Sequence, residues 1–196
     1  MTLRCKIGHR IHWSGVPGSP PAALVLGALL LHGLRPGQTL YAEHADIDQA
    51  FAFILDNVCA QSPVYVHRDY MPRNLMVSDP NPGVIDFQDA VAGPISYDVI
   101  SLFKDAFLSW PEARVLNWLR EYFDKATAAG LPVPKDFDTF LRDCDLMGAQ
   151  RHIKVIGIFA RICHRDGKPK YLGDVPRFFA YLRTVIARRP ELADLQ

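Results

Sequence analysis

From about residue 45 onward, apolar residues recur every three or four positions, which is the spacing of the buried face of a helix. Gly and Pro interrupt this spacing and mark the ends of the segments. The pattern predicts helices at about residues 45–60, 95–106, 110–129, 136–164 and 176–188. Most of the chain is therefore expected to be helical.

Short strands are predicted between the first two of these helices. Val64–Val66 is apolar and follows the helix-ending run Gln61-Ser62-Pro63. The segments 74–77 and 84–85 flank SDPNPG, a run of turn-forming residues, so they are expected to pair as a β-hairpin. The predicted fold class is α+β: mostly helical, with one small hairpin.

Residues 1–40 differ from the rest, because they are rich in Gly, Pro and small apolar residues and show little periodicity. The run PAALVLGALLLHGL at 21–34 resembles the apolar part of a signal peptide. It is shorter than the ~20 residues that cross a bilayer, and no small-residue cleavage site follows promptly. We therefore interpret 1–40 as an atypical segment of uncertain structure, 41–196 as the main domain, and the protein as having no membrane partner.

Composition narrows the class of protein further. A chain of 196 residues with 49% apolar residues and a formal charge of +1 indicates a globular domain, and it argues against nucleic-acid binding and disorder. The four cysteines are far apart and form no CxxC pair. We expect reduced cysteines in a cytoplasmic protein, not a zinc site or a disulfide framework.

The run VYVHRDYMPRNLMV at 64–77 ends an apolar strand in a charged cluster, which is costly unless the cluster has a task. Asn74 begins the first strand of the predicted hairpin and Asp86 ends the second, so the two lie side by side in an antiparallel pair. The loop that carries Asp69 meets them there. Such oxygen ligands suit Mg²⁺, and a further carboxylate facing the metal can accept a proton from a hydroxyl group, as phosphoryl transfer requires.

These motifs resemble those of a known family. HRDYMPRN is similar to the catalytic loop H-R-D-x-x-x-x-N of protein-kinase-like enzymes, and IDFQD resembles the IDF-x-D of the aminoglycoside phosphotransferase superfamily. The runs GVIDFQDAVAGPISYDVISLFKDAF and QRHIKVIGIFARICHRDGKPKYLGD resemble the bacterial anomeric kinases of N-acetylmuramate and N-acetylglucosamine, which act in cell-wall recycling. The resemblance covers about residues 41–196. It implies a kinase-like C-terminal lobe, ATP with Mg²⁺, and an amino-sugar substrate.

The resemblance also implies roles for individual residues. Asp69 would be the catalytic base, and Asn74 and Asp86 would hold the metal. His67 would support the catalytic loop by hydrogen bonding, and Asp98 would brace it from the following helix.

Three further residues are weaker candidates for binding the substrate. Asp89 follows the IDF run and is assigned equally to loop bracing or to a substrate contact. Arg151 and His152 lie on a predicted helix that could line the sugar site, and a surface position is at least as well supported.

A second HRD triplet, His164-Arg165-Asp166, has a different context. Tyr171, not Asn, stands five residues after Asp166, and no hairpin follows. We interpret this triplet as a charged helix terminus.

The nucleotide-binding half of a kinase is hard to find in this sequence. Kinase-like enzymes hold ATP between two lobes, with a loop over the phosphates and a Lys paired with a Glu. Before His67, Lys6 is the only Lys and Glu43 the only Glu, and no Gly-rich loop follows a strand. We expect the N-terminal lobe to be missing, and the chain alone to bind ATP weakly and to self-associate.

Two functions remain open on the sequence. The first is an ATP-dependent kinase of an amino sugar, with a kinase of an aminoglycoside, choline or homoserine as the alternative substrate class. The second is a truncated, non-catalytic remnant that binds a sugar or a partner without competent ATP binding.

Overall fold

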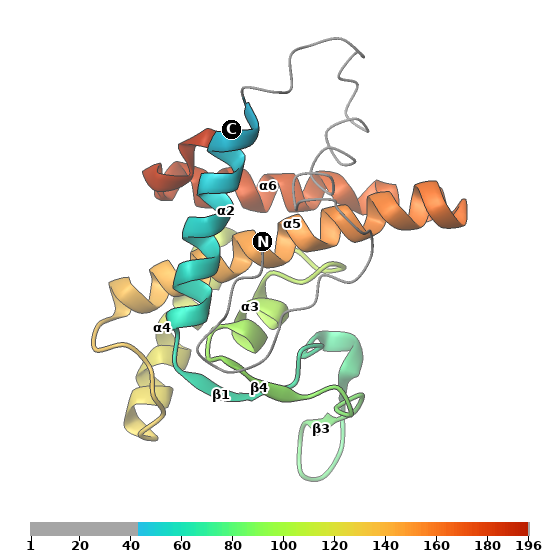
Figure 1. Cartoon of the computed structure of the whole chain (residues 1–196). Coiled ribbons are helices and arrows are strands. Elements are labelled where there is room, and N and C mark those ends of the chain that lie inside the picture. Colours follow the sequence, from blue (N-terminus) through green and yellow to red (C-terminus); the bar gives the residue numbers. More distant parts are fainter. Residues whose placement is uncertain (1–42, 196) are drawn as a thin grey trace. The chain divides into compact units, whose positions relative to one another are not determined.

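The computed structural model describes residues 43–195 (Figure 1), so the atypical segment expected at 1–40 lies outside the described residues. The helices are α2 (Glu43–Ala60), α3 (Tyr97–Phe103), α4 (Glu112–Ala128), α5 (Phe137–Asp166) and α6 (Val175–Arg188). The strands are β1 (Pro63–Val66), β2 (Leu75–Met76), β3 (Gly83–Val84) and β4 (Val91–Pro94). Short 3-10 helices span Pro72–Asn74, Pro169–Asp174 and Pro190–Leu195. A mostly helical chain with few short strands is compatible with the expected kinase-like lobe, and the absence of an N-terminal lobe stays a prediction.

The predicted helices are confirmed, with two differences at their ends. The second helix is shorter than expected, because Asp105 accepts hydrogen bonds from the backbone N–H groups of Phe107 and Leu108 and turns the chain. The third begins at Glu112 instead of at Trp110-Pro111. Pro111 precedes it in an extended conformation (φ −55°, ψ 136°) and caps its first turn.

The described chain divides into two compact units, residues 60–149 and residues 43–59 with 150–195. We call the first the loop unit and the second the terminal unit. The boundary predicted near residue 41 remains a prediction, because it falls among residues that are not described.

The loop unit contains the strands. The predicted hairpin is confirmed, since Leu75 pairs with Val84 and Met76 with Gly83 in antiparallel register. A further antiparallel pair joins β1 to β4, from Pro63 opposite Pro94 to Val66 opposite Val91 (Figure 1). The sequence pattern gave no sign of β4, because the segment VAGP combines Gly and Pro, which are rare in strands.

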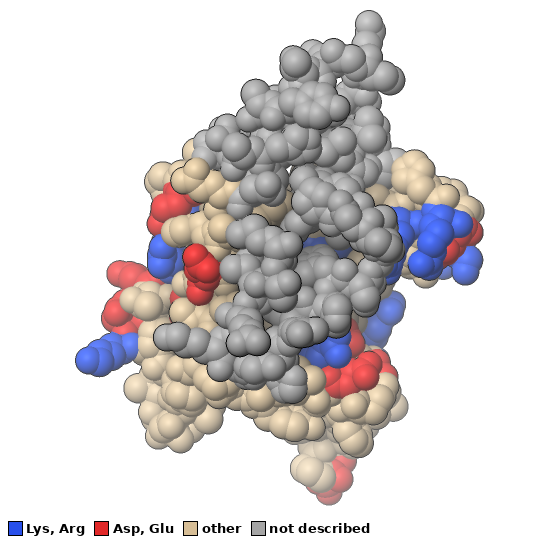
Figure 2. All heavy atoms as spheres, in the orientation of Figure 1, with Lys and Arg blue, Asp and Glu red and all other residues tan. Residues whose placement is uncertain are grey.

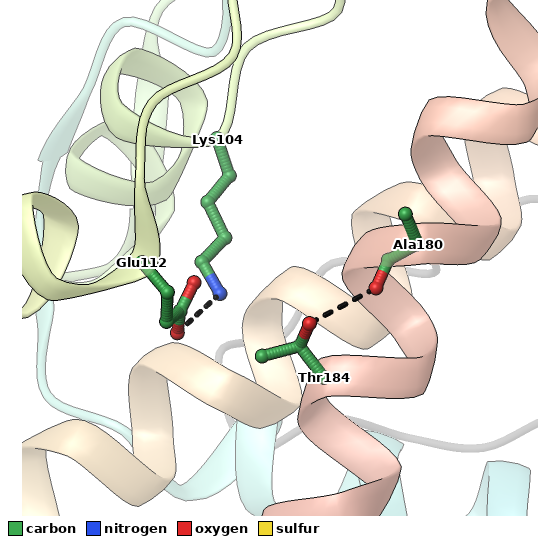
Figure 3. A network of polar contacts seen from close by, with 4 residues as sticks. All are labelled: Lys104, Glu112, Ala180 and Thr184. Atoms are coloured by element: carbon green, nitrogen blue, oxygen red, sulfur yellow. Dashed lines mark hydrogen bonds and ion pairs between the residues drawn. The ribbon is translucent and has the colours of Figure 1, made fainter.

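Helices α3, α4 and the first part of α5 supply most of the buried side chains of the loop unit. Among them are Ile100, Leu119, Phe140, Leu146 and Met147. An ion pair between the buried Lys104 and the half-buried Glu112 joins the end of α3 to the start of α4: Lys104 Nζ lies 3.3 Å from Glu112 Oε1 (Figure 3).

The terminal unit has an aromatic core. Phe178 and Tyr181 are buried on α6 and contact the His152 ring on α5, whose centroid is 5.7 Å and 4.8 Å from theirs. Phe179 is half-buried. Phe178 and Tyr181 are thus packing residues of this core. On the same helix, Thr184 Oγ1 donates to the Ala180 carbonyl at 3.0 Å (Figure 3).

The second HRD triplet ends α5, as expected. Its three residues are exposed, and Arg165 donates two hydrogen bonds to the Asp166 carboxylate, at 2.6 and 3.0 Å. Gly167 follows with φ +63°, the left-handed conformation that ends helices. Lys and Arg gather at this end of α5 (Figure 2), among them Arg161, Arg165, Lys168 and Lys170.

No helix among residues 43–195 has both the length and the apolarity that a bilayer crossing demands.

Candidate functional site

The catalytic-loop motif follows directly after β1, and one carboxylate binds the backbone of its first two residues. Asp98, in the first turn of α3, accepts hydrogen bonds from the backbone N–H groups of His67 (2.6 Å, to Oδ2) and Arg68 (3.0 Å, to Oδ1). Arg68 has φ +78°, a conformation that costs a non-glycine residue roughly 1 kcal/mol. The two bonds to Asp98 offset this strain and fix the direction in which the loop leaves the strand.

The His67 ring ties this loop to the end of the hairpin. The ring is buried at 6% exposure, and its Nε2 lies 2.9 Å from the carbonyl oxygen of Ile85. A carbonyl can only accept, so Nε2 carries the proton in this contact. Ile85 precedes Asp86, which is also left-handed (φ +67°). The ring therefore anchors the peptide that sets the orientation of Asp86.

Asn74 is the hub of the site. It is buried at 8% exposure in the 3-10 turn Pro72–Asn74, and its Nδ2 donates to the Asp69 carbonyl at 2.9 Å and to Asp86 Oδ2 at 3.4 Å. Its own carbonyl accepts from the backbone of Ile85 at 3.1 Å. The strand pairing has thus brought Asn74 and Asp86 together, as we expected from an antiparallel hairpin.

These two residues fit a magnesium ion. Both donor bonds of Asn74 use its amide nitrogen, so its amide oxygen and the Asp86 carboxylate are the atoms that can face a cation. Gln88 Nε2 donates to Asp86 Oδ1 at 2.8 Å and orients that carboxylate. Residues 43–195 contain no group of three or more His, Cys, Asp and Glu with metal-binding geometry. Mg²⁺ needs no such group, because it takes one or two protein ligands and completes its shell with water and phosphate oxygens.

Asp69 presents an exposed carboxylate beside this pair. Its backbone carbonyl is bound by Asn74, whereas its side chain makes no hydrogen bond or ion pair within the described residues. A carboxylate that is held through its backbone and open to solvent through its side chain can accept a proton from an incoming hydroxyl group.

The weaker candidates lie in different surroundings. Asp89 is exposed, and its backbone carbonyl accepts from Arg68 Nη1 at 3.4 Å, so its contact with the loop does not use its carboxylate. Arg151 and His152 belong to the terminal unit, where Arg151 is half-buried and His152 is buried at 2% exposure against Tyr181. The environment of His152 is that of a packing residue. A substrate role for each of the three stays a prediction.

Two groups of the loop unit, the half-buried Tyr122 and the buried Cys144, have raised pKa values. Burial raises the pKa of the Tyr122 phenol, and Cys144 and Asp98 nearby raise it further. Burial also raises the pKa of the Cys144 thiol well above its usual value, and the neighbouring carboxylates of Asp145 and Asp143 add to this. Both groups are therefore neutral at physiological pH, and Cys144 is not a reactive thiolate.

One contact of the loop has no signal in the sequence pattern. The guanidinium carbon of Arg73 lies 3.8 Å from the centre of the Phe107 ring, in the segment that joins α3 to α4. Periodicity reports which residues share a face of one element, so it cannot reveal a contact between a loop and a distant connection.

Comparison with known proteins establishes the class. The model of the phosphotransferase enzyme family, APH, matches residues 19–141, so the chain belongs to this family.

Individual relatives narrow the comparison. The chain is 65% identical over 154 residues to an N-acetylmuramate/N-acetylglucosamine kinase of Pseudomonas putida, a match that covers 79% of the chain and 45% of that protein. It is 71% identical over 135 residues to the protein of the same name in Pseudomonas aeruginosa, over 69% of the chain and 40% of the relative. The corresponding protein of Neisseria meningitidis is 56% identical over 142 residues, which are 72% of the chain and 42% of the relative. The chain thus spans less than half the length of these curated relatives, and its resemblance to this group is confirmed.

Proposed function

We propose that the chain carries the catalytic half of an ATP-dependent kinase that phosphorylates a hydroxyl group of a small amino sugar, of the N-acetylmuramate or N-acetylglucosamine type. The observation that carries the proposal is the contact of Asn74 with both the Asp69 backbone and the Asp86 carboxylate. It supports a site in which Asp69 would be the base and Asn74 and Asp86 would hold the metal, which is a sufficient set for phosphoryl transfer. The names of the relatives support the substrate class.

In this proposal each residue has a defined task. Asp69 accepts the proton of the sugar hydroxyl as that oxygen attacks the terminal phosphorus of ATP, and ADP leaves with the electrons of the broken bond. Asn74 and Asp86 would hold Mg²⁺, which neutralises phosphate charge when bound. His67 and Asp98 keep the loop and Asp86 in register through the backbone contacts described above.

The second candidate is a remnant that binds sugar without turnover. The observation in its favour is that the sequence before His67 holds one Lys, Lys6, and no Gly-rich loop that follows a strand. Tight binding of phosphates needs a cradle of backbone N–H groups and a cationic side chain. We expect the chain alone to bind ATP weakly.

Self-association is also part of the proposal. Several large apolar side chains of the loop unit are exposed, among them Tyr65 (77%), Val77 (97%) and Phe87 (61%). Exposed apolar surface of this kind favours association or a covering partner. Light scattering of the purified chain between 1 and 100 µM, roughly the range in which weak dimers form, checks this.

One experiment separates the two candidates. The chain is assayed with labelled ATP against N-acetylmuramate, N-acetylglucosamine, an aminoglycoside, choline and homoserine, first alone and then fused to the part of the Pseudomonas putida relative that it does not match. We expect slow or no turnover alone and phosphorylation of the amino sugars by the fusion. A fusion that binds ATP but phosphorylates none of the compounds would refute the kinase assignment, and fast turnover by the chain alone would refute the remnant.

A further inference from the structure

Arg73 is a cationic residue of the catalytic loop to which the proposed function gives no task. It is exposed and lies between Asp69 and Asn74 in the sequence, and its guanidinium sits over the Phe107 ring at 3.8 Å. Stacking on a ring uses the face of the guanidinium and leaves its in-plane N–H groups available. Within residues 43–195 those N–H groups make no hydrogen bond and no ion pair.

The ring beneath Arg73 is itself held in place. Asp105 is buried at 3% exposure, and its Oδ2 accepts from the backbone N–H groups of Phe107 (3.0 Å) and Leu108 (3.1 Å). Charge-assisted bonds of this kind are roughly twice as strong as neutral ones. The loop after α3 therefore presents Phe107 as a fixed platform, and the guanidinium on it is preorganised for a ligand, which lowers the entropy cost of binding.

An exposed arginine over an aromatic ring is often only a packing contact, and the loop unit offers an example. Arg120 on α4 lies over Phe137 at 3.4 Å. Arg73 differs in its position, because its neighbour in the chain is Asn74, whose side chain contacts Asp69 and Asp86. Arg120 is thus a matched control for Arg73.

The net charge of the loop unit makes a cation such as Arg73 important for binding an anion. Residues 60–149 contain thirteen Asp and Glu but eight Lys and Arg, so an anionic substrate approaching this unit meets a net negative charge. Arg68, the other cation of the loop, already donates to the Asp89 carbonyl and has further contacts. Of the two, Arg73 is the one with unoccupied donors among the described residues.

We propose that Arg73 binds the carboxylate of an acidic amino sugar and so determines the preference for the acid over its neutral counterpart. The fork of a guanidinium matches a carboxylate in two parallel hydrogen bonds. N-acetylmuramate carries such a carboxylate and N-acetylglucosamine does not. The inference rests on the proposed function, since it assigns a substrate group to the same site.

Binding measurements on the 196-residue chain test the inference without requiring turnover. Calorimetry at low salt compares N-acetylmuramate, its neutral carboxamide and N-acetylglucosamine. The proteins are the parent, Arg73→Gln, Arg73→Lys and Arg120→Gln. We expect Arg73→Gln to lose about 10- to 100-fold in affinity for N-acetylmuramate, as the loss of a charge-assisted pair predicts, and less than about twofold for the two neutral sugars. Arg73→Lys should lose less, because it keeps the charge without the fork, and Arg120→Gln should match the parent.

The outcomes distinguish the inference from the proposal beneath it. If the parent binds none of the three sugars, the proposed sugar site fails and the inference fails with it. If the parent binds them and Arg73→Gln weakens all three equally, Arg73 only positions the loop and the inference alone is wrong. An affinity for N-acetylmuramate that Arg73→Gln leaves unchanged would also overturn it.

Discussion

The tripeptide His-Arg-Asp occurs twice in this chain and has two different structures. At 67–69 its backbone is bound by the Asp98 carboxylate and its histidine is buried against the Ile85 carbonyl. At 164–166 all three residues are exposed at the end of α5, and the arginine pairs with the adjacent aspartate. The residues are the same, so their surroundings decide the chemistry. In the first triplet the aspartate side chain is left open to a ligand, whereas in the second it is already paired.

The largest difference between the triplets is expected in turnover. Asp69→Asn removes the proposed base, and loss of a general base costs about 10²–10⁴-fold in rate. Asp166→Asn should change the rate by less than about twofold, because general-base catalysis requires contact with the reacting group. The assay uses the fused chain with N-acetylmuramate and labelled ATP, with thermal unfolding as a control for folding. Turnover of Asp69→Asn near the parent rate would remove Asp69 from the mechanism.

A second large effect is expected at the proposed metal ligand. Asp86→Ala leaves Asn74 as the single protein ligand, so nucleotide affinity should lose its dependence on Mg²⁺, with a drop of about tenfold or more, since the carboxylate is the charged member of the pair. Calorimetry of the fused chain with ATP, with and without Mg²⁺, measures this. Asp89→Ala is the control, because within the described residues the hydrogen bond between Asp89 and the loop uses its backbone carbonyl and not its carboxylate. A magnesium dependence equal to that of the parent would show that Asp86 does not hold the metal.

The next largest effect is expected in the free energy of unfolding, through the hydrogen bonds that hold the first triplet. Asp98→Ala leaves the N–H groups of His67 and Arg68 without their acceptor, which we expect to lower the free energy of unfolding by about 2–3 kcal/mol. The control is Asp124→Ala, an exposed aspartate on α4 for which a change within about 0.5 kcal/mol is expected. Urea unfolding of the chain provides both values. Equal stability of the two variants would show that the hydrogen bonds to Asp98 do not stabilise the fold.

A smaller effect is expected at the end of the second triplet. Gly167 has φ +63°, and a Cβ there would meet no atom within 4 Å, so the cost of Gly167→Ala is conformational alone. We expect a loss of about 1 kcal/mol in the free energy of unfolding. Gly173→Ala, where a Cβ also has open space and the backbone is not left-handed, should cost less. If the two substitutions destabilise the chain equally in urea unfolding, the left-handed conformation of Gly167 does not contribute to the cost.

The smallest effect is expected from Asp166 itself, and it depends on pH. The hydrogen bonds from Arg165 lower the pKa of Asp166 in the folded chain. A lowered pKa stabilises the fold above the pKa of the unfolded side chain, and this contribution disappears as the pH falls through the folded value. At an exposed site screening makes it small, so Asp166→Asn should lower the melting temperature by about 1 °C or less at pH 7. The difference should shrink as the pH falls below the usual Asp pKa of ~3.9. A larger difference in acid than at pH 7 would show that the Arg165–Asp166 pair does not stabilise the fold.

The sequence predicted the parts of the molecule that depend on local chemistry. Helical spacing located the helices, and the turn formers between 78 and 83 located the hairpin that brings Asn74 and Asp86 together. It missed β4, because VAGP contains Gly and Pro and shows no strand pattern of its own, so only its pairing with β1 identifies it as a strand. It also missed the platform of Asp105 and Phe107 under Arg73. Contacts between elements are set by tertiary packing. The pattern of residues within one element does not predict them.

The pairing of Val66 with Val91 has a consequence for how the site forms. Only 24 residues separate these two, and they include every side chain assigned here to the base and the metal. The entropy of closing a loop rises slowly with its length, by ~0.6 kcal/mol per doubling, so a loop of this size is inexpensive to close. Once β1 and β4 meet, the loop that carries Asp69 still needs the carboxylate of Asp98 from beyond them to bind its backbone. The site is thus nearly self-contained in sequence, and it is expected to assemble early and locally during folding, ahead of contacts that join more distant parts of the chain.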